Sequence, residues 1–203
     1  MEERVNPKSD AGRVTAERLF DESAEVKRKF VRENGERIER VAQRMAQTLR
    51  RGGKILLFGN GGSACDASHL AAEFVGRFKE DREALAAISL TTDMAALTCI
   101  SNDYDYSEIF KRQIAALGKA DDLAIAISTS GNSLNVIKGV ETANARGLQT
   151  VAFTGGSGGK LVTLAHESFV VPSRVTARIQ ECHITLGHVL CELVEGLLFG
   201  VRG

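Results

Sequence analysis

Short apolar segments recur along the middle of the chain. Each is rich in valine, isoleucine, leucine, alanine or phenylalanine, and none alternates cleanly between apolar and polar residues. The segments are KILLFGN (54–60), ALAAISL (84–90), DLAIAIST (122–129), LQTVAFTG (148–155) and ESFVVPS (167–173). Apolar segments of this kind are typical of strands that are covered on both faces. The pattern therefore predicts five buried strands.

Stretches with a helical period separate most of these strands. Apolar residues recur at intervals of three and four at Ala71, Phe74, Val75 and Phe78, and again along 136–143. Strands that alternate with helices are typical of a parallel sheet. We expect a Rossmann-like α/β fold, a three-layer sandwich in which helices flank a five-stranded parallel sheet.

Both ends of the chain lack strand candidates. Residues 13–50 predict N-terminal helices with an interrupted apolar stripe, after a flexible tail at 1–12. Residues 174–199 predict one long helix that ends at Gly200, and its apolar sector is wider than one sheet face requires. We expect these terminal helices to mediate a homo-oligomer. The alternative is a monomer with thick helical layers.

The composition is that of one soluble domain, with 203 residues of which 43% are hydrophobic and 26% charged. Lysine plus arginine equal aspartate plus glutamate at 26 each, which argues against binding to nucleic acid or to an acidic membrane. No apolar run approaches the roughly 18 to 20 residues that span a bilayer, and the N-terminus is charged. Four widely spaced cysteines predict reduced thiols. We expect a single domain over 1–203, located in the cytoplasm.

A glycine turn, Gly59-Asn60-Gly61-Gly62, joins the first strand to the next helix. Ser63 is the expected N-cap of that helix, with Asp66 three residues later. Glycines let the backbone approach a ligand, and a helix start favours an anion or polar hydroxyls. The G-x-G-x-x-G spacing of dinucleotide sites is not present, and there is no Walker lysine. The alternative is a turn with a purely structural role.

A hydroxyl-rich loop, Ser128-Thr129-Ser130-Gly131-Asn132-Ser133, follows the third strand and precedes a helix. Ligands of open α/β sheets bind at the carboxyl ends of strands. Four hydroxyls, backbone N–H groups and a helix dipole make a neutral receptor for phosphate. Serine and asparagine are also ordinary turn residues. This loop is the second candidate ligand site in the chain, after the glycine turn. The two loops together favour binding of a phosphorylated metabolite.

His69 and Glu73 lie four residues apart, so both occupy one face of the predicted helix and could bind a metal ion. The same spacing is common in solvated pairs, and a metal site requires further ligands. The candidates on the C-terminal helix are Gln180, Glu181, His183 and His188. The residues alone do not choose among the first three. Two imidazoles, a carboxylate and an amide would suit zinc, although an amide ligand is uncommon.

Gln180 and His188 pose a geometric problem. They are eight residues apart, which is about 12 Å along an ideal helix and a long span for one ion. Either the helix is irregular near Gln180, or a neighbouring subunit supplies some ligands.

Two other polar sites have a simpler interpretation without a functional role. His166 is expected at the surface. Asn102-Asp103 is expected in a loop after a helix, where asparagine and aspartate are ordinary turn residues.

Together these motifs resemble the sugar isomerase (SIS) domain family and, within it, the phosphoheptose isomerases. The resemblance covers residues 14–199. It rests on five segments in order: GNGGSACDASHLAAE, SNDYDY, AISTSGNSLNVIKG, AFTGGSGGKL and RIQECHITLGHVLCELVE. It implies isomerisation of sedoheptulose 7-phosphate to D-glycero-D-manno-heptose 7-phosphate, the first step toward ADP-heptose or GDP-heptose precursors of lipopolysaccharide and other surface glycans. It also implies a homotetramer with active sites at subunit contacts.

The resemblance further implies roles for individual residues. The phosphate would be held by Ser128, Thr129, Ser130 and Ser133. The sugar chain would meet Asn60, Gly61, Gly62, Glu73, Asn102, Asp103 and Gln180. One Zn²⁺ per subunit would be bound by His69, Glu73, Gln180 and His188. Glu73 would be the base and His188 the acid of a ketose–aldose interconversion through an enediol.

Two other classes of protein share this pattern. A non-catalytic SIS scaffold that binds the bacterial replication initiator would keep the fold and lose the acid and base, whereas this chain retains Glu73, Gln180 and His188. A sugar-phosphate sensor is usually fused to a DNA-binding domain, and no helix-turn-helix with a basic recognition helix is seen before residue 14. We therefore expect an enzyme.

Overall fold

The computed structural model describes residues 7–200, which contain one five-stranded parallel sheet. The strands are β1 (Ile55–Gly59), β2 (Ala87–Ser89), β3 (Leu123–Ile127), β4 (Gln149–Gly155) and β5 (Glu167–Val171). Each strand falls within a predicted segment. The strands lie in the order β2-β1-β3-β4-β5, so the direction of winding reverses between β1 and β3. Ligand sites of doubly wound sheets lie outside the carboxyl ends of strands at such a reversal.

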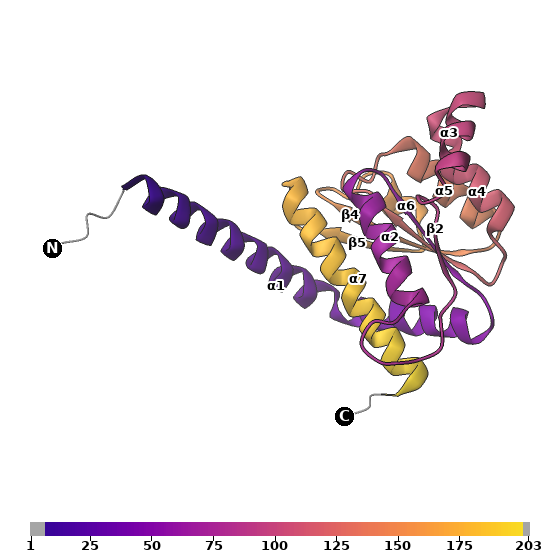
Figure 1. The fold of residues 1–203 in the computed structure, drawn as a ribbon, viewed down its shortest axis with the longest axis horizontal. Coiled ribbons are helices and arrows are strands. Elements are labelled where there is room, and N and C mark those ends of the chain that lie inside the picture. Colours follow the sequence, from indigo (N-terminus) through magenta and orange to yellow (C-terminus); the bar gives the residue numbers. More distant parts are fainter. Residues whose placement is uncertain (1–6, 201–203) are drawn as a thin grey trace.

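Helices cover both faces of the sheet (Figure 1). One face carries α1 (Pro7–Arg50), α2 (Gly62–Val75) and α7 (Thr176–Phe199). The other face carries α3 (Met94–Asp103), the 3₁₀ turn η1 (Tyr106–Glu108), α4 (Ile109–Leu117), α5 (Leu134–Ala145) and α6 (Leu161–Leu164). Within β1, Ile55 and Leu57 pack into the first core, and Leu56 and Phe58 pack into the second. Burial on both faces explains why the strands are uniformly apolar, and the predicted three-layer fold is confirmed.

The N-terminal segment forms one continuous helix of 44 residues, α1, instead of several helices after a tail. Proline is favoured at the first helical position because its fixed φ suits the helix and its missing N–H is not needed there. The helix therefore begins at Pro7, within the expected tail, and residues 1–6 lie outside the described residues. The first half of α1 projects away from the sheet (Figure 1). Phe20 there is 79% exposed, whereas Val41 and Met45 near the sheet are buried.

The C-terminal helix α7 ends as predicted at Gly200, which has a φ of 81°. It packs against α1 and α2, with Ile179 and Leu190 buried and Leu193 partly exposed. Among the described residues, α7 is the one helix whose length and composition would allow it to cross a membrane, which the run-length argument did not anticipate. Core helices of soluble proteins meet the same criterion, and the buried face of α7 also carries His183 and Glu195.

Candidate active site

The glycine turn after β1 packs tightly against β3. A Cβ atom on Gly59 would lie 2.7 Å from the carbonyl oxygen of Ile127, and Gly61 has a φ of 55°. The N-cap of α2 is Gly61 and not Ser63, because helical hydrogen bonding begins earlier than expected: the Ser63 N–H donates to the Asn60 carbonyl oxygen (3.0 Å). Ser63 is buried in the first turn. Among the described residues no side chain caps this helix start, and the N–H groups of Ser63, Ala64 and Cys65 donate to the carbonyl oxygens of Asn60 and Gly61.

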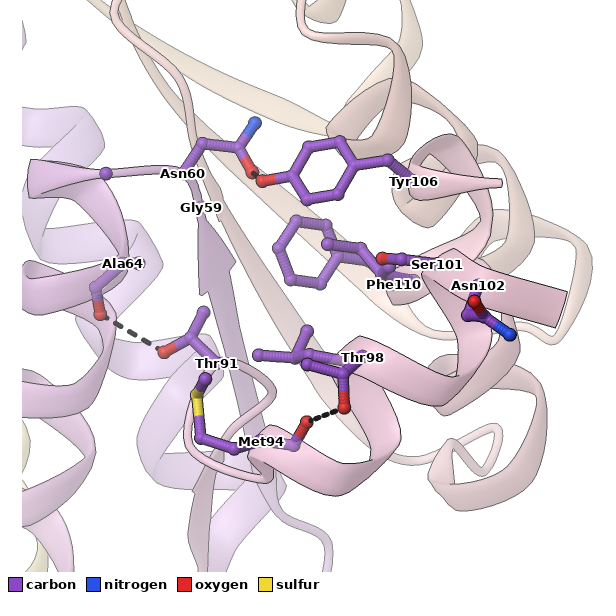
Figure 2. Close-up of a pocket in the computed structure, with 13 residues that line it drawn as sticks. Gly59, Asn60, Ala64, Thr91, Met94, Thr98, Ser101, Asn102, Tyr106 and Phe110 are labelled. Atoms are coloured by element: carbon purple, nitrogen blue, oxygen red, sulfur yellow. Dashed lines mark hydrogen bonds between the residues drawn. The ribbon is translucent and has the colours of Figure 1, made fainter. Parts of the chain in front are cut away.

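Asn60 lies at the edge of a cavity of about 530 Å³ and is held by two other side chains. Its amide exchanges two hydrogen bonds of 2.8 Å with the amide of buried Asn135, and the Tyr106 hydroxyl donates to its Oδ1 atom (3.0 Å). Figure 2 shows Asn60 and Tyr106 facing each other at one end of the cavity, with Met94 and Thr98 at the other end. Tyr106 was not among the predicted site residues, because nothing local in the sequence connects it to Asn60.

Asn102 also lines this cavity, together with Gly61. Asn102 and Asp103 form the last turn of α3 instead of a loop, and the Asn102 amide donates to the Asp103 carboxylate (2.9 Å). The structure thus brings Asn60, Gly61 and Asn102 of the predicted sugar-binding set around one cavity.

The hydroxyl loop connects β3 to α5 as predicted. The Oγ atoms of Ser128 and Ser133 are 3.1 Å apart, and Ser130 Oγ accepts a hydrogen bond from the Asn132 N–H (3.2 Å). Ser133 is the N-cap of α5 but makes no side-chain capping hydrogen bond. In the first turn the Val136 N–H donates to Asn135 Oδ1 (2.9 Å), and the positive end of α5 faces the loop, which suits an anion.

A second glycine loop, residues 155–160, packs directly against the hydroxyl loop. A Cβ atom on Gly131 would lie 1.9 Å from the carbonyl oxygen of Gly158, and Gly131 has a φ of 65°. Backbone and side-chain hydrogen bonds also join the two loops, from Lys160 N–H to Asn132 Oδ1 (3.1 Å) and from Leu161 N–H to the Gly131 carbonyl (3.1 Å). The hydroxyl loop is thus held by close contact with residues 155–160, and the loops can approach this closely only because glycines lie at the contact.

Arg174 brings a positive charge to the neighbourhood of the hydroxyl loop. It lines a cavity of about 260 Å³ with Thr129 and Ser130. The loop itself contains no lysine or arginine, so the sequence indicated a neutral phosphate receptor. The cation was missed because it lies before α7, far from the loop in sequence.

His69, Glu73 and His188 converge between α2 and α7. The Nε2 atoms of the two histidines are 2.9 Å apart, and the His69 Nε2 atom is 3.4 Å from the Glu73 carboxylate. One nitrogen or oxygen from each residue lies within 4.8 Å of the other two. A Cβ atom on Gly187 would lie 2.4 Å from the Leu70 side chain, so this glycine lets α7 approach α2 closely enough for the imidazoles to meet.

The donor set of this group fits a metal ion. Two imidazole nitrogens and a carboxylate oxygen are ligands that zinc accepts, and ligands of a tetrahedral zinc ion lie roughly 3 to 4 Å apart. The His69 side chain is half exposed and that of Glu73 is 22% exposed, so a substrate can reach the group. The group can also move protons, since a carboxylate and an imidazole face the same space.

The remaining candidates on α7 have separate environments. His183 is buried, and its Nε2–H donates to the Thr154 carbonyl oxygen (3.0 Å); burial lowers the pKa of His183 to about 4. Glu181 pairs with Arg178 at 2.5 Å. Gln180 lies over the glycine turn, where a Cβ atom on Gly62 would be 2.5 Å from its Nε2 atom. His183 is therefore a core residue and Glu181 an ion-pair partner, and α7 shows no interruption between Gln180 and His188.

The chain is similar to known proteins over most of its length. The SIS domain family profile matches residues 18–155. Phosphoheptose isomerases from Thermodesulfovibrio yellowstonii and Aquifex aeolicus are 59% and 57% identical over 184 and 181 residues, which cover 91% and 89% of this chain and 92% and 95% of theirs. The structure of the phosphoheptose isomerase from Neisseria gonorrhoeae superposes with a TM-score of 0.85 at 43% identity, covering 92% of this chain and 98% of that one.

The chain belongs to the SIS domain family, whose fold the sheet order and flanking helices reproduce. Identity and coverage then narrow the assignment: within that family it belongs to the phosphoheptose isomerases, which are aldose–ketose isomerases. The predicted family and enzyme class are confirmed. The scaffold alternative receives no support from these relatives.

Proposed function

We propose that the protein converts sedoheptulose 7-phosphate to D-glycero-D-manno-heptose 7-phosphate. The observation that carries the proposal is the convergence of His69, Glu73 and His188 within 4.8 Å, in a chain that belongs to the phosphoheptose isomerases. An aldose–ketose interconversion needs a base beside the carbon that loses a proton and an acid beside the carbonyl oxygen. A carboxylate and an imidazole that face each other supply both.

The hydroxyl loop binds the phosphate in this proposal. Ser128, Thr129, Ser130 and Ser133 provide hydroxyls, and the start of α5 provides the positive end of a dipole. Arg174 adds a cation at the rim. The tight packing on residues 155–160 supports a loop that is already shaped for the anion.

The sugar chain meets the residues of the glycine turn and α3. Asn60, Gly61 and Asn102 line the cavity beside the turn, which supports their role. Gly62, Glu73, Asp103 and Gln180 complete the proposed set. Phosphate at the end of β3 and the sugar along the end of β1 fit the position at which the winding of the sheet reverses.

Glu73 and His188 carry the proton transfers. Glu73 removes a proton from C1 while His188 protonates the C2 carbonyl oxygen, which yields the enediol. Glu73 then returns the proton to C2 and His188 takes the proton from the C1 hydroxyl, which leaves the C1 aldehyde. Each residue ends in its starting protonation state, so the cycle is balanced.

His69, Glu73, Gln180 and His188 are the proposed ligands of one zinc ion per subunit, and the proposal does not require Glu73 and His188 to stay on the metal while they transfer protons. When bound, the ion supplies a positive charge that stabilises the developing enediolate oxygen. Because about 12 Å of helix rise separates Gln180 from His188 in an uninterrupted α7, we infer that a neighbouring copy supplies one of them. This requirement and the exposed apolar residues of α1 and α7 support a homotetramer with shared active sites.

We propose that the protein acts in the cytoplasm, at the start of heptose precursor synthesis for lipopolysaccharide or other surface glycans. Neither nucleic acid nor a membrane is a proposed partner.

Incubation of the purified protein with sedoheptulose 7-phosphate tests the proposal, with the aldose product followed over time. We expect turnover that a chelator abolishes and added zinc restores. Ser130→Ala should weaken binding of the sugar phosphate by about tenfold, because a hydrogen bond to a charged group is lost. Thr163→Ala, which removes an exposed hydroxyl on α6, should not. A metal-replete protein without turnover would refute the isomerase assignment, and turnover that resists chelation would refute the metal.

A further inference from the structure

The segment 76–86, between α2 and β2, is anchored to α7 by one buried carboxylate. Glu195 accepts hydrogen bonds from the backbone N–H groups of Phe78 (3.3 Å), Lys79 (3.0 Å) and Glu80 (2.8 Å). It also forms an ion pair with Arg82 at 2.7 Å, and the two side chains are only 4% and 3% exposed. Burial alone would raise the pKa of Glu195, but these donors hold it below its usual value, so the carboxylate stays ionised.

The guanidinium of Arg82 also caps the end of α2. It donates to the carbonyl oxygens of Glu73 (2.8 Å) and Phe74 (2.9 Å), in the last turn of the helix. The last carbonyls of a helix lack partners within it and form the negative end of its dipole, so a buried cation is well matched there. One ion pair therefore ties the backbone of Glu73 on α2 to Glu195 on α7.

The same anchor binds the backbone of Phe78, and the ring of Phe78 contacts His188. Glu195 and His188 are seven residues apart on α7, so they share one face of the helix. The Phe78 ring stacks on the His188 imidazole, with centroids 5.6 Å apart and an angle of 29° between the planes. The ring of His69 meets the same imidazole edge to face at 5.1 Å. The His188 ring thus has aromatic neighbours on two sides.

We propose that Phe78, fixed by the Arg82–Glu195 pair, is a positioning residue that sets the orientation of the His188 imidazole toward Glu73. The proposal rests on the function proposed above for His188. Without the ring, the imidazole can rotate about its side-chain bonds, and the proton transfer loses alignment more than the substrate loses affinity. The anchor also holds the Glu73 backbone. One buried ion pair therefore fixes the positions of both reacting groups, the Glu73 carboxylate and the His188 imidazole.

Phe78→Leu tests the positioning role, because it removes the ring and keeps the backbone N–H that Glu195 binds. We expect kcat to fall about tenfold with KM within about twofold of wild type, since misalignment acts on the chemical step. Phe169→Leu makes the same change in the core, where the ring packs on Phe30 and Phe153. That control should lose stability and keep kcat. A Phe78→Leu variant with wild-type kcat would overturn the proposal.

A spectroscopic measurement gives a readout independent of turnover. In metal-free protein with ¹³C-labelled histidine, the His188 resonances, identified from their loss in His188→Gln, should shift in Phe78→Leu as the ring current disappears. Unchanged resonances would refute the positioning role whether or not the protein turns over substrate. Absent turnover in the wild type would refute the proposed function, so the two failures are distinguishable.

A double variant tests whether the ion pair acts through Phe78. Glu195→Gln should lower both stability and kcat, because it removes the charge that Arg82 faces in the interior. If Glu195 acts through the ring, Glu195→Gln combined with Phe78→Leu has about the kcat of the more damaged single variant. If the fold losses of kcat in the two single variants multiply in the double variant, Glu195 and Phe78 act separately. That result would refute the link between the ion pair and the ring.

Discussion

The hydroxyl loop and the α2–α7 contact differ in what holds them. The hydroxyl loop is fixed by backbone, since Gly131 packs on Gly158 and main-chain groups bridge the two loops. The group between α2 and α7 depends on side chains: His69 is half exposed and meets His188 across two helices. In the proposed function the first region is a rigid phosphate receptor within a single chain, and the second is open to substrate, metal and a neighbouring copy. The difference separates binding from chemistry, so substitutions in the two regions should affect different measurements.

The largest effect should come from Glu73→Gln, which keeps the shape of the side chain and removes the proposed base. We expect kcat to fall by about 10³-fold, because general base catalysis contributes on this scale. Substrate affinity should change little, since the phosphate loop is untouched. Single-turnover isomerisation and a separate binding measurement give the two values.

Glu141→Gln on α5 is the matched control, because it makes the same change away from the histidines. Its activity should equal that of wild type. A Glu73→Gln protein with near-normal single-turnover rates would contradict the division between the two regions.

Gly131→Ala tests the rigid region. The new Cβ atom would meet the Gly158 carbonyl, so we expect a loss of about 3 kcal/mol in the free energy of unfolding, from the positive φ and from overpacking together. Gly156 also has a positive φ of 62°, but a Cβ atom there meets nothing within 4 Å. Gly156→Ala should therefore lose only about 1 kcal/mol. Urea denaturation of both variants measures the difference, and equal losses would show that the loops are not tightly interlocked.

His183 predicts a pH effect on stability that does not involve the active site. Its folded pKa of about 4 lies below its ordinary value, so between these values the unfolded chain binds a proton that the folded chain does not. The stability contribution is complete above pH 6.5 and is lost as the pH falls toward 4. Nδ1 has no hydrogen-bond partner among the described residues, so protonation would leave a buried donor unpaired.

Between pH 7 and pH 5 the wild type should lose about 2 kcal/mol more stability than His183→Gln, whose amide can still donate to the Thr154 carbonyl. Urea unfolding at the two pH values gives the comparison. If both proteins respond equally to pH, His183 is not buried in its neutral form.

Much of the rigid region was predictable from sequence, and much of the open region was not. Apolar runs indicate strands, and clusters of glycines and hydroxyl residues indicate loops. Both signals come from residues that are adjacent in sequence, so they can be recognised without the structure. The meeting of His188 with His69 depends on Gly187 packing on Leu70, which joins distant parts of the chain. His183 and His188 stand five residues apart on one helix, and only tertiary packing makes the first a core residue and the second a member of the cluster.

Tyr106→Phe should produce the smallest effect, and it refines the boundary between binding and chemistry. The hydroxyl donates to Asn60 Oδ1, and its loss leaves that oxygen with the Asn135 amide alone. One neutral hydrogen bond contributes about 1 kcal/mol, so KM should rise a few-fold with kcat nearly unchanged. Tyr104→Phe, which changes a tyrosine that stacks on Arg112 outside the cavity, is the control. A fall in kcat at constant KM would instead assign Tyr106 to the chemical step, and the reacting region would then include the cavity beside Asn60.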